Sequence, residues 1–392
     1  MLNAGIVNVD ADRKWIGGLY YLHHLVRCVA ALPEDERVRL FDVWWRGAPE
    51  SDPFAGVRPL LAGRRVLGPP SSLPLRIVRR VRRALHGWSD ARDLFLDAGI
   101  DVLFPIAPCA LPGVPFVFWI PDFQYRHLPD LFSPEMRDWY EWHYGGNGRA
   151  ADLIAVSSES GRQDLIRFFP ALAEKARVLR FSSVPAEEWW RRDPAEVAEK
   201  HALPEKFFIL SNQFSHHKNH LVAFDAVRRL RDEHGLAVTV ACTGSTYGFR
   251  GDDYMQRVDA FLDEHALRGQ IRILGLIPRE EQIALTRRAL ATLQPSRFEG
   301  WSTVVEDAKV LGKPILLSDL DVHREQAPQS VTYLPLDDSA AWAARMAETW
   351  SAREPGPHAD EETAGRDFSE RARLATGRTF AAILNEAVTR RR

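Results

Sequence analysis

The feature that most constrains the fold is a regular alternation of apolar runs and amphipathic segments through the second half of the 392-residue chain. The apolar runs have the length of strands, and the segments between them have helical spacing. Strands are predicted at 207–211, 237–243, 271–275, 289–294 and 314–318. Helices are predicted at 219–233, 253–266, 279–288 and 303–311. Because strands that alternate with helices form parallel sheets with helices on both faces, this half predicts a doubly wound α/β domain.

The first half repeats the alternation less cleanly. Its strands are predicted at 4–9, 38–44, 101–104, 115–120 and 153–157. A chain of this length exceeds the size at which one hydrophobic core usually stops growing, so we expect two Rossmann-like domains that face a cleft. The first should span 1–190 and the second 191–367, since prolines punctuate the stretch between 185 and 204. Residues 368–392 predict a terminal helix.

Composition argues against several classes of protein. The formal net charge is -2, which implies no general affinity for polyanions, so nucleic acid is not expected as a partner. The first ten residues predict a strand rather than a secretory signal, and no apolar run approaches the roughly 20 residues of a bilayer span. We therefore expect a cytoplasmic protein. Cys28, Cys109 and Cys242 stand singly in apolar surroundings, which predicts buried thiols without a disulfide framework.

A loop with a carboxylate at each end lies between a predicted strand and a predicted helix. It reads Ser296-Arg-Phe-Glu-Gly-Trp-Ser-Thr-Val-Val-Glu306. Backbone amides at a helix start attract anionic oxygens, and Gly300 allows close approach of a ligand to the backbone. Glu299 and Glu306 would be free to accept hydrogen bonds from hydroxyls. The window therefore favours a site for a phosphate and a sugar together, although an ordinary capped helix start has the same appearance.

A second polar loop follows the strand predicted at 207–211 and leads into the next helix. Its lysine, Lys218, should lie at the carboxyl end of a strand, which is where open α/β sheets bind ligands. An ammonium group there can neutralise a diphosphate leaving group. His216, His217 and His220 share this loop, and we interpret them as solvated histidines rather than metal ligands because no cysteine or acidic cluster adjoins them.

These two windows resemble the retaining glycosyltransferases of family 4, which have the GT-B fold. The resemblance implies that Glu299 contacts the donor sugar, Glu306 the nucleotide ribose and Lys218 the diphosphate. It also implies that the terminal helix crosses back to the first domain. Within these windows the chain departs from the family in two ways: six residues separate its glutamates where seven are usual, and Gln213 stands where an arginine is expected. The donor-binding set is Gln213, Lys218, Glu299, Gly300, Trp301, Ser302, Thr303, Val304 and Glu306.

The first half supplies candidates for the acceptor side. Gly17 and Gly18 lie between the first predicted strand and the first predicted helix. A glycine pair there either allows close approach of a phosphate or acceptor or forms a plain tight turn. The family has a glycine-rich loop at this point. Asp122 follows the strand at 115–120 and could orient or deprotonate a hydroxyl. The family's histidine is replaced by Pro121, and His127 is either its substitute or a surface histidine. Ser158 or Ser160 should cap the next helix.

Neither a metal ion nor a cofactor is expected. Two Asp-x-Asp spacings, Asp10 with Asp12 and Asp319 with Asp321, have the form that holds a divalent ion in other glycosyltransferases. We interpret both as loop aspartates, because similar loops in family 4 bind no metal.

The segment at about 75–88 is strongly basic, with leucines and valines on one helical face and arginines around them. Such a helix can lie on an anionic membrane surface, which would make the protein peripheral at the inner membrane. A core-facing helix with a solvated basic face is the other interpretation.

These observations predict a retaining, metal-independent hexosyltransferase. It would move a sugar from a nucleotide-sugar donor to a glycan or lipid-linked acceptor, as in surface polysaccharide or O-antigen assembly, with Asp122, Lys218 and Glu299 as catalytic residues. A noncatalytic sugar-nucleotide-binding protein and a GT-B-fold epimerase or phosphorylase remain alternatives. The base, the sugar and the linkage are left open by the sequence.

Overall fold

The computed structural model describes residues 1–7, 16–45, 52–67, 98–106, 114–247 and 253–391. Asp10, Asp12, Cys109 and the basic segment at 75–88 therefore lie outside the described residues. By its internal contacts the chain forms two units. The first is Met1–Ser182 with Ala372–Arg392, and the second is Ser183–Arg371.

The second unit is built on a six-stranded sheet in which every pairing is parallel, as predicted. The strand order is β10-β9-β8-β11-β12-β13, so the winding reverses between β8 and β11. In open α/β sheets, ligands bind outside the carboxyl ends of the two strands between which the winding reverses. The strands are β8 (Phe208–Ser211), β9 (Val240–Thr243), β10 (Ile271–Gly275), β11 (Thr292–Gln294), β12 (Ile315–Ser318) and β13 (Val331–Leu334).

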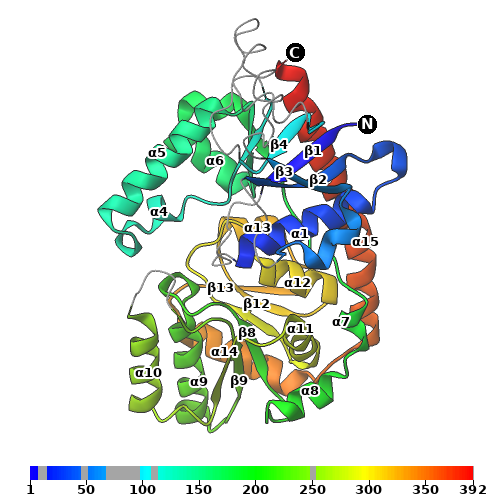
Figure 1. Cartoon of the computed structure of the whole chain (residues 1–392). Helices are drawn as coiled ribbons and strands as arrows, with labels where there is room; N and C mark the ends of the chain where they lie inside the picture. Colours follow the sequence, from blue (N-terminus) through cyan, green and yellow to red (C-terminus); the bar gives the residue numbers. More distant parts are fainter. Residues whose placement is uncertain (8–15, 46–51, 68–97, 107–113, 248–252, 392) are drawn as a thin grey trace, which may run out of the picture. The chain divides into compact units, whose positions relative to one another are not determined.

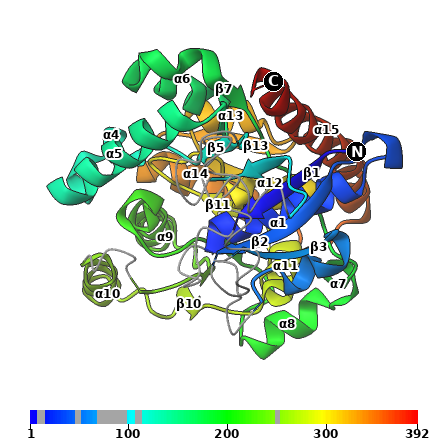
Figure 2. The same cartoon turned by 45° about the horizontal axis from the view of Figure 1, so that its top comes forward.

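Helices cover both faces of this sheet. One face packs against α9 and α14 through a core that includes Phe224, Trp342 and Met346. The other packs against α8 and α11 through Val197 and Leu285, and these two helices lie side by side in Figures 1 and 2. The helices are α7 (Glu188–Arg191), α8 (Pro194–Lys200), α9 (His220–His234), α10 (Tyr254–Glu264), α11 (Arg279–Arg288), α12 (Thr303–Leu311), α13 (Asp321–Gln326) and α14 (Ser339–Ala352), with the 3-10 turn η5 (His216–Lys218) before α9.

The first unit is also a parallel α/β structure. Four strands form the order β3-β2-β1-β4 and three form β5-β6-β7, and a parallel bridge from Leu103 to Phe116 joins the two sets. The strands are β1 (Asn3–Val7), β2 (Arg39–Trp45), β3 (Gly63–Leu67), β4 (Val102–Phe104), β5 (Val117–Ile120), β6 (Leu153–Val156) and β7 (Ala176–Val178). Figure 1 shows this unit in blue, cyan and green.

The helices of the first unit are α1 (Ile16–Ala30), α4 (Gln124–His127), α5 (Pro134–Ala150) and α6 (Glu159–Phe168), with 3-10 turns η1 (Glu34–Glu36), η2 (Ala55–Leu60), η3 (Pro129–Leu131) and η4 (Pro170–Lys175). The predicted cap of α6 is confirmed, since the Ser158 hydroxyl accepts a hydrogen bond from the Gly161 amide at 2.9 Å.

The last helix, α15 (Ala359–Arg391), begins in the second unit and ends in the first, which confirms the predicted crossing. In the second unit its residue Gly365 lies so close to α12 that a Cβ there would be 2.5 Å from the Val310 carbonyl oxygen. In the first unit Phe380 packs 4.9 Å from the ring of Phe104, and Glu386 pairs with Arg177. The helix therefore belongs to both cores. Among the described residues, no helix has both the length and the apolarity that crossing a bilayer demands.

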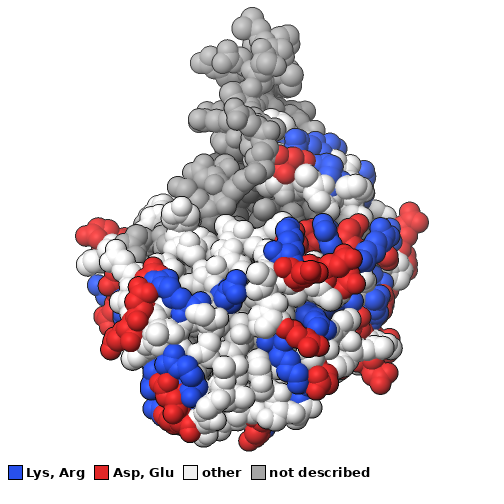
Figure 3. Space-filling view, turned by 90° about the horizontal axis from the view of Figure 1, so that it is seen from below, with Lys and Arg blue, Asp and Glu red and all other residues white. Residues whose placement is uncertain are grey.

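The described residues carry surface charges of both signs (Figure 3) and two buried thiols. Acidic and basic side chains lie next to one another on the face seen in Figure 3. Helix α9 also carries ion pairs between Arg228 and Asp225 and between Arg229 and Glu233. Cys28 and Cys242 are buried free thiols, as predicted, and burial raises the pKa of Cys242.

Candidate functional site

The reversal of strand order in the second unit brings the two predicted sequence windows together. Lys218 follows β8 and Glu299 follows β11, and these are the neighbouring strands between which the winding changes direction. Their side chains meet, with Lys218 Nζ 2.6 Å from Glu299 Oε1. The pair is largely removed from solvent, since the two side chains are only 17% and 9% exposed.

The backbone around Lys218 is set by the asparagine that follows it. Lys218 ends η5, and Asn219 takes a left-handed conformation with φ of 54°, which asparagine tolerates better than most residues. The Asn219 side chain donates to the Leu336 carbonyl at 2.8 Å, and this hydrogen bond also holds the turn in place. Gln213, earlier in the same loop, is exposed.

Opposing effects set the charge of Glu299. Burial alone would raise the pKa of this carboxyl group, but the charges of Lys218, His323 and His217 and the hydrogen bond from Lys218 outweigh burial. The pKa of Glu299 therefore lies below its usual value. The site at rest contains a carboxylate and an ammonium group in contact.

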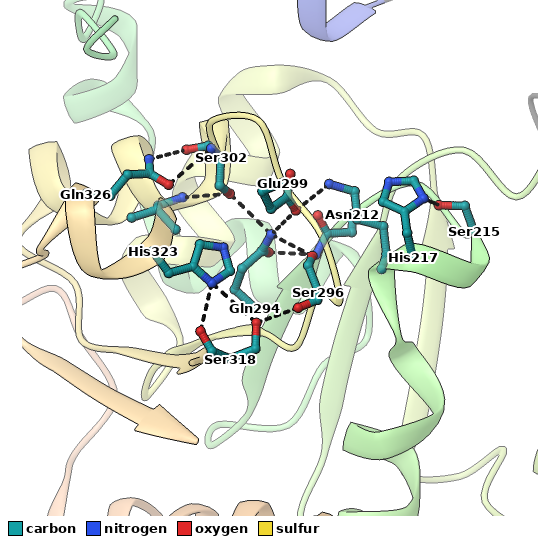
Figure 4. A network of polar contacts seen from close by, with 12 residues as sticks. Asn212, Ser215, His217, Gln294, Ser296, Glu299, Ser302, Ser318, His323 and Gln326 are labelled. Carbon is teal, nitrogen blue, oxygen red and sulfur yellow. Dashed lines mark hydrogen bonds and ion pairs between the residues drawn. The ribbon is translucent and has the colours of Figure 1, made fainter. Parts of the chain in front are cut away.

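Gln294, the last residue of β11, holds the same carboxylate. It is completely buried, and its Nε2 lies 2.8 Å from Glu299 Oε1, 3.1 Å from Ser296 Oγ and 3.2 Å from Ser302 Oγ. Its Oε1 accepts from Asn212 Nδ2 at 2.7 Å. Figure 4 shows the Gln294 amide among these residues.

The loop ends at the capped start of α12. Ser302 is the N-cap, and its hydroxyl accepts from the Val305 amide at 3.4 Å. The amides of Thr303 and Val304 belong to the first helical turn, where no intrahelical acceptor exists. Together with the positive end of the helix dipole they form a suitable place for an anion. Gly300 and Trp301 are partly buried, and the Trp301 ring lies 5.9 Å from Lys309 Nζ.

Glu306 lies in this first turn with its side chain turned into the protein. Its Oε1 accepts from Lys309 Nζ at 2.9 Å and from Gln326 Nε2 at 3.0 Å, and the side chain is 1% exposed. Burial raises the pKa of Glu306, and Lys309 and Gln326 offset only part of that effect. Oε1 of each glutamate thus already has an amide and an ammonium partner, which the sequence did not predict.

His323 belongs to the same network and contacts the last residue of β12, Ser318. Its Nδ1 lies 2.8 Å from the Ser318 carbonyl oxygen, and the Ser318 hydroxyl donates to the Ser296 carbonyl at 2.6 Å. The ring is completely buried, and desolvation lowers the pKa of His323. A chain of polar contacts thus runs from α13 through Ser318 and Ser296 to Gln294 and Glu299 (Figure 4).

The interpretation of all three loop histidines as solvated is wrong for His220. That residue begins α9, is completely buried, and stacks on Phe214 with ring centroids 4.3 Å apart. Burial lowers its pKa to about 3. His216 and His217 remain partly exposed, with His216 beside Asp253 at 3.2 Å and His217 beside Ser215 at 3.1 Å.

The acceptor-side candidates all lie in the first unit. Gly17 and Gly18 do not form a turn ahead of the helix but lie inside the first turn of α1, with Gly17 exposed and Gly18 buried. Asp122 follows β5, and its Oδ1 accepts from the Gln124 amide at 2.8 Å. His127 contacts Asp164 of α6 through Nε2 at 2.7 Å.

Two of the carboxylates that could suggest a metal site lie before and at the start of α13. Asp319 pairs with Arg324 at 2.6 Å, and Asp321 begins α13. Within the described part of the chain, no three histidine, cysteine, aspartate or glutamate side chains converge as metal ligands would.

Sequence reasoning missed several residues of this network, among them Gln294, Ser318, His323 and Gln326. The signal for Gln294 and Ser318 was present, since each is the last residue of a predicted strand and so lies at the edge of the sheet that binds ligands. His323 and Gln326 lie on α13, a helix of six residues that is too short to show helical periodicity in the sequence.

Comparisons with known proteins concern the fold and the family of the second unit. Residues 192–355 match the family model described as glycosyl transferases group 1. The chain is similar to Alr3699/HepE from Anabaena, solved with UDP and glucose, at a TM-score of 0.64 and 13% identity over 98% of this chain and 100% of that chain. For sucrose-phosphate synthase from Thermosynechococcus elongatus the TM-score is 0.62, with 15% identity over 98% and 97% of the two chains.

A third similar structure is WaaG, a glycosyltransferase involved in lipopolysaccharide biosynthesis, with a TM-score of 0.59 and 12% identity over 98% of this chain and 99% of that chain. No curated protein sequence matches the chain. At these identities the structures establish the fold, and the family model covers residues 192–355. Residues 192–355 therefore match the group 1 glycosyl transferases, and nearly the whole chain shares the GT-B fold of these solved structures.

Proposed function

We propose that this glycosyltransferase is a retaining, metal-independent enzyme that transfers a hexose from a nucleotide-sugar donor to a glycan or lipid-linked acceptor. One observation carries the proposal: the buried Lys218–Glu299 pair lies where the winding of the sheet reverses, next to the N-terminus of α12. This arrangement combines a cation and helix amides for a diphosphate with a carboxylate for sugar hydroxyls.

Lys218 and the amides of Thr303 and Val304 would stabilise the diphosphate as it leaves. Negative charge on the leaving group grows as the glycosidic bond breaks, and donors already in place stabilise that charge without reorganisation. When the diphosphate binds, Lys218 exchanges part of its contact with Glu299 for phosphate oxygens. The Glu299 carboxylate then accepts hydrogen bonds from the sugar, while Gln294 continues to hold its Oε1.

The nucleotide would contact the other glutamate. Assigning the ribose to Glu306 requires that its carboxylate accept from ribose hydroxyls beside, or in place of, Lys309 and Gln326. The structural relative from Anabaena was solved with UDP-glucose, so UDP-glucose is the first donor to test.

The acceptor would bind to the first unit, near Gly17, Gly18 and Asp122, with His127 on the same side. Asp122 would orient or deprotonate the attacking hydroxyl. Retention places that attack on the face from which the diphosphate departs. A lipid-linked acceptor, as in surface polysaccharide or O-antigen assembly, would agree with membrane contact through the basic segment at 75–88.

The test is a panel of UDP-, GDP- and dTDP-sugars, measured by thermal shift and by release of nucleoside diphosphate with added acceptors. A true donor must stabilise the folded state by mass action, in proportion to the logarithm of its concentration above Kd. Lys218→Ala is the test variant. Lys206→Ala is its matched control, because Lys206 belongs to the same unit but donates to the Arg353 carbonyl and pairs with Glu354.

Three outcomes are informative. Stabilisation and turnover that are both lost in Lys218→Ala and kept in Lys206→Ala support the proposal. Stabilisation without turnover across the acceptor panel would favour a noncatalytic binding protein. If no nucleotide sugar or nucleoside diphosphate stabilises the protein, the proposed donor site is wrong.

A further inference from the structure

Each glutamate of the donor loop is held by a buried glutamine from a different element. Gln294 of β11 donates to Glu299 Oε1 at 2.8 Å, and Gln326 of α13 donates to Glu306 Oε1 at 3.0 Å. Gln294 is completely buried and Gln326 is 2% exposed. Buried amides are costly unless they are hydrogen-bonded, so these contacts specify a geometry as well as satisfying polar groups.

The orientation of the Gln294 amide follows from its neighbours. Its oxygen faces Asn212 Nδ2, which is a donor, and its nitrogen faces the Glu299 carboxylate, which can only accept. Rotating the amide by 180° would place its oxygen against the carboxylate and its nitrogen against another NH2 group. Asn212 therefore fixes the direction in which Gln294 presents its donor to Glu299.

The Gln326 amide binds the loop in a different way. Its Oε1 accepts from the Ser302 amide at 3.1 Å, and its Nε2 donates to the Ser302 carbonyl at 3.0 Å. These two hydrogen bonds, to the amide and the carbonyl of one residue, resemble those between paired β-strands. The same Nε2 also reaches Glu306.

Both glutamines meet at Ser302, the N-cap of α12. Gln294 lies 3.2 Å from its hydroxyl, and Gln326 binds its backbone amide and carbonyl. Ser302 stands between the glutamates, three residues after Glu299 and four before Glu306. Its position therefore bears on how far apart the two carboxylates lie and where the first amides of α12 point.

We propose that Gln294 and Gln326 are positioning residues of the donor site, which together fix the shortened loop between Glu299 and Glu306 through Ser302. The inference rests on the proposed function and assigns the two glutamines separate effects. Gln294 governs the sugar side, because it holds Glu299. Gln326 governs the nucleotide side, because it holds Glu306 and the backbone from which the helix amides begin.

Two variants separate these effects from a general loss of structure. Gln294→Met and Gln326→Met keep side-chain length and remove the amide. The matched control is Gln270→Met, since the Gln270 amide donates to the Val238 carbonyl at 3.0 Å in the same unit, away from the donor loop. If Gln294→Met does not fold, Gln294→Asn retains the amide but shortens its reach by one methylene.

Gln294→Met should lower kcat by about tenfold or more and change the preference among donor sugars, with the Kd for free UDP within about twofold of the wild type. Gln326→Met should raise the Kd for UDP by about tenfold or more. Gln270→Met should leave both constants near wild-type values. A purely structural role for the glutamines would lower thermal stability and change both constants together, which would overturn the inference.

Hydrogen exchange of the amides at 303–306 tests the same inference without a nucleotide. Gln294→Met and Gln326→Met should both accelerate exchange there and leave the strand at 208–211 unchanged, whereas Gln270→Met should alter neither region. Unchanged exchange at 303–306 in both variants would overturn the positioning role. If the wild type binds none of UDP, GDP and dTDP, the proposed function fails while this measurement still decides whether the glutamines hold the loop.

Discussion

Replacing Lys218 by alanine tests the central pair of the site in two independent ways. The substitution removes the cation expected at the diphosphate, so turnover should fall by about two orders of magnitude or more, the range observed when one preorganised charge-stabilising donor is lost. It also leaves the Glu299 carboxylate buried without its ammonium partner. Stability should therefore fall as well, even in the absence of any ligand.

The size of the stability change follows from burial. Breaking a buried pair by removing one partner costs about 3–5 kcal/mol, and the remaining exposure of Lys218 favours the lower end, about 3 kcal/mol. The second unit spans the 189 residues from Ser183 to Arg371. For a domain of that size each kcal/mol shifts Tm by about 2–4 °C, so Lys218→Ala should lower Tm by about 6–12 °C at pH 7.

The sign of the pH dependence gives a further check. In the wild type the pKa of Glu299 is depressed, so the pair contributes stability above the ordinary carboxyl pKa and loses it as pH falls. In Lys218→Ala burial is no longer opposed by that cation and should raise the pKa of Glu299. The difference in Tm between the variant and the wild type should therefore shrink in acid.

Thermal unfolding of four proteins completes the test: wild type, Lys218→Ala, Glu299→Gln and the double variant. Glu299→Gln in the Lys218→Ala background should recover most of the lost stability, because the uncompensated charge is gone, while turnover stays low. The reasoning is refuted if Lys218→Ala keeps near-normal turnover, or if removing the Glu299 charge recovers none of the stability.

Three other predictions concern the metal, the two glutamates and the buried histidine. Activity should survive excess EDTA; loss with EDTA and recovery with manganese or magnesium would reopen the metal role of Asp319 and Asp321. Calorimetry with free nucleoside diphosphate should show weaker binding to Glu306→Ala and unchanged binding to Glu299→Ala, and the reverse pattern would mean that the shortened loop has exchanged their roles. Because the pKa of His220 is lowered to about 3, its protonation disfavours the folded state below pH 6.5, by about 2 kcal/mol at pH 5. His220→Phe should therefore flatten the decline of Tm between pH 6.5 and pH 5. An unchanged slope would exclude His220 as the source of that decline.

Much of the fold could be predicted because its signals are local. Buried parallel strands are continuous apolar runs, and α9, α11 and α12 show helical spacing between them. The strands β3, β7 and β13 were missed because they lie at sheet edges, where apolar patterning is weak. The first turn of α1 was placed too late because two glycines are poor helix formers on their own, and tertiary contacts override that preference.

The site was predictable only in part. Lys218 and Glu299 could be proposed from the sequence as donor-site candidates, because each follows a strand in a pattern that suits phosphate and sugar binding. Their contact could not be predicted, because 81 residues separate them and local sequence patterns do not show which distant segments meet. The same limit applies to Gln294, whose role depends on Asn212, Ser302 and Glu299 converging on it.

The sequence alone thus determined the alternation of elements, the two parallel-sheet units and the loops that carry the donor-site candidates. These follow from hydrophobic periodicity and turn chemistry, which act over a few residues. Only the tertiary structure decided that the carboxylates of Glu299 and Glu306 are already paired, that His220 is buried, and that two glutamines meet at Ser302. Those facts depend on the strand order β8-β11-β12, because the reversal of winding brings side chains from distant segments to one edge of the sheet.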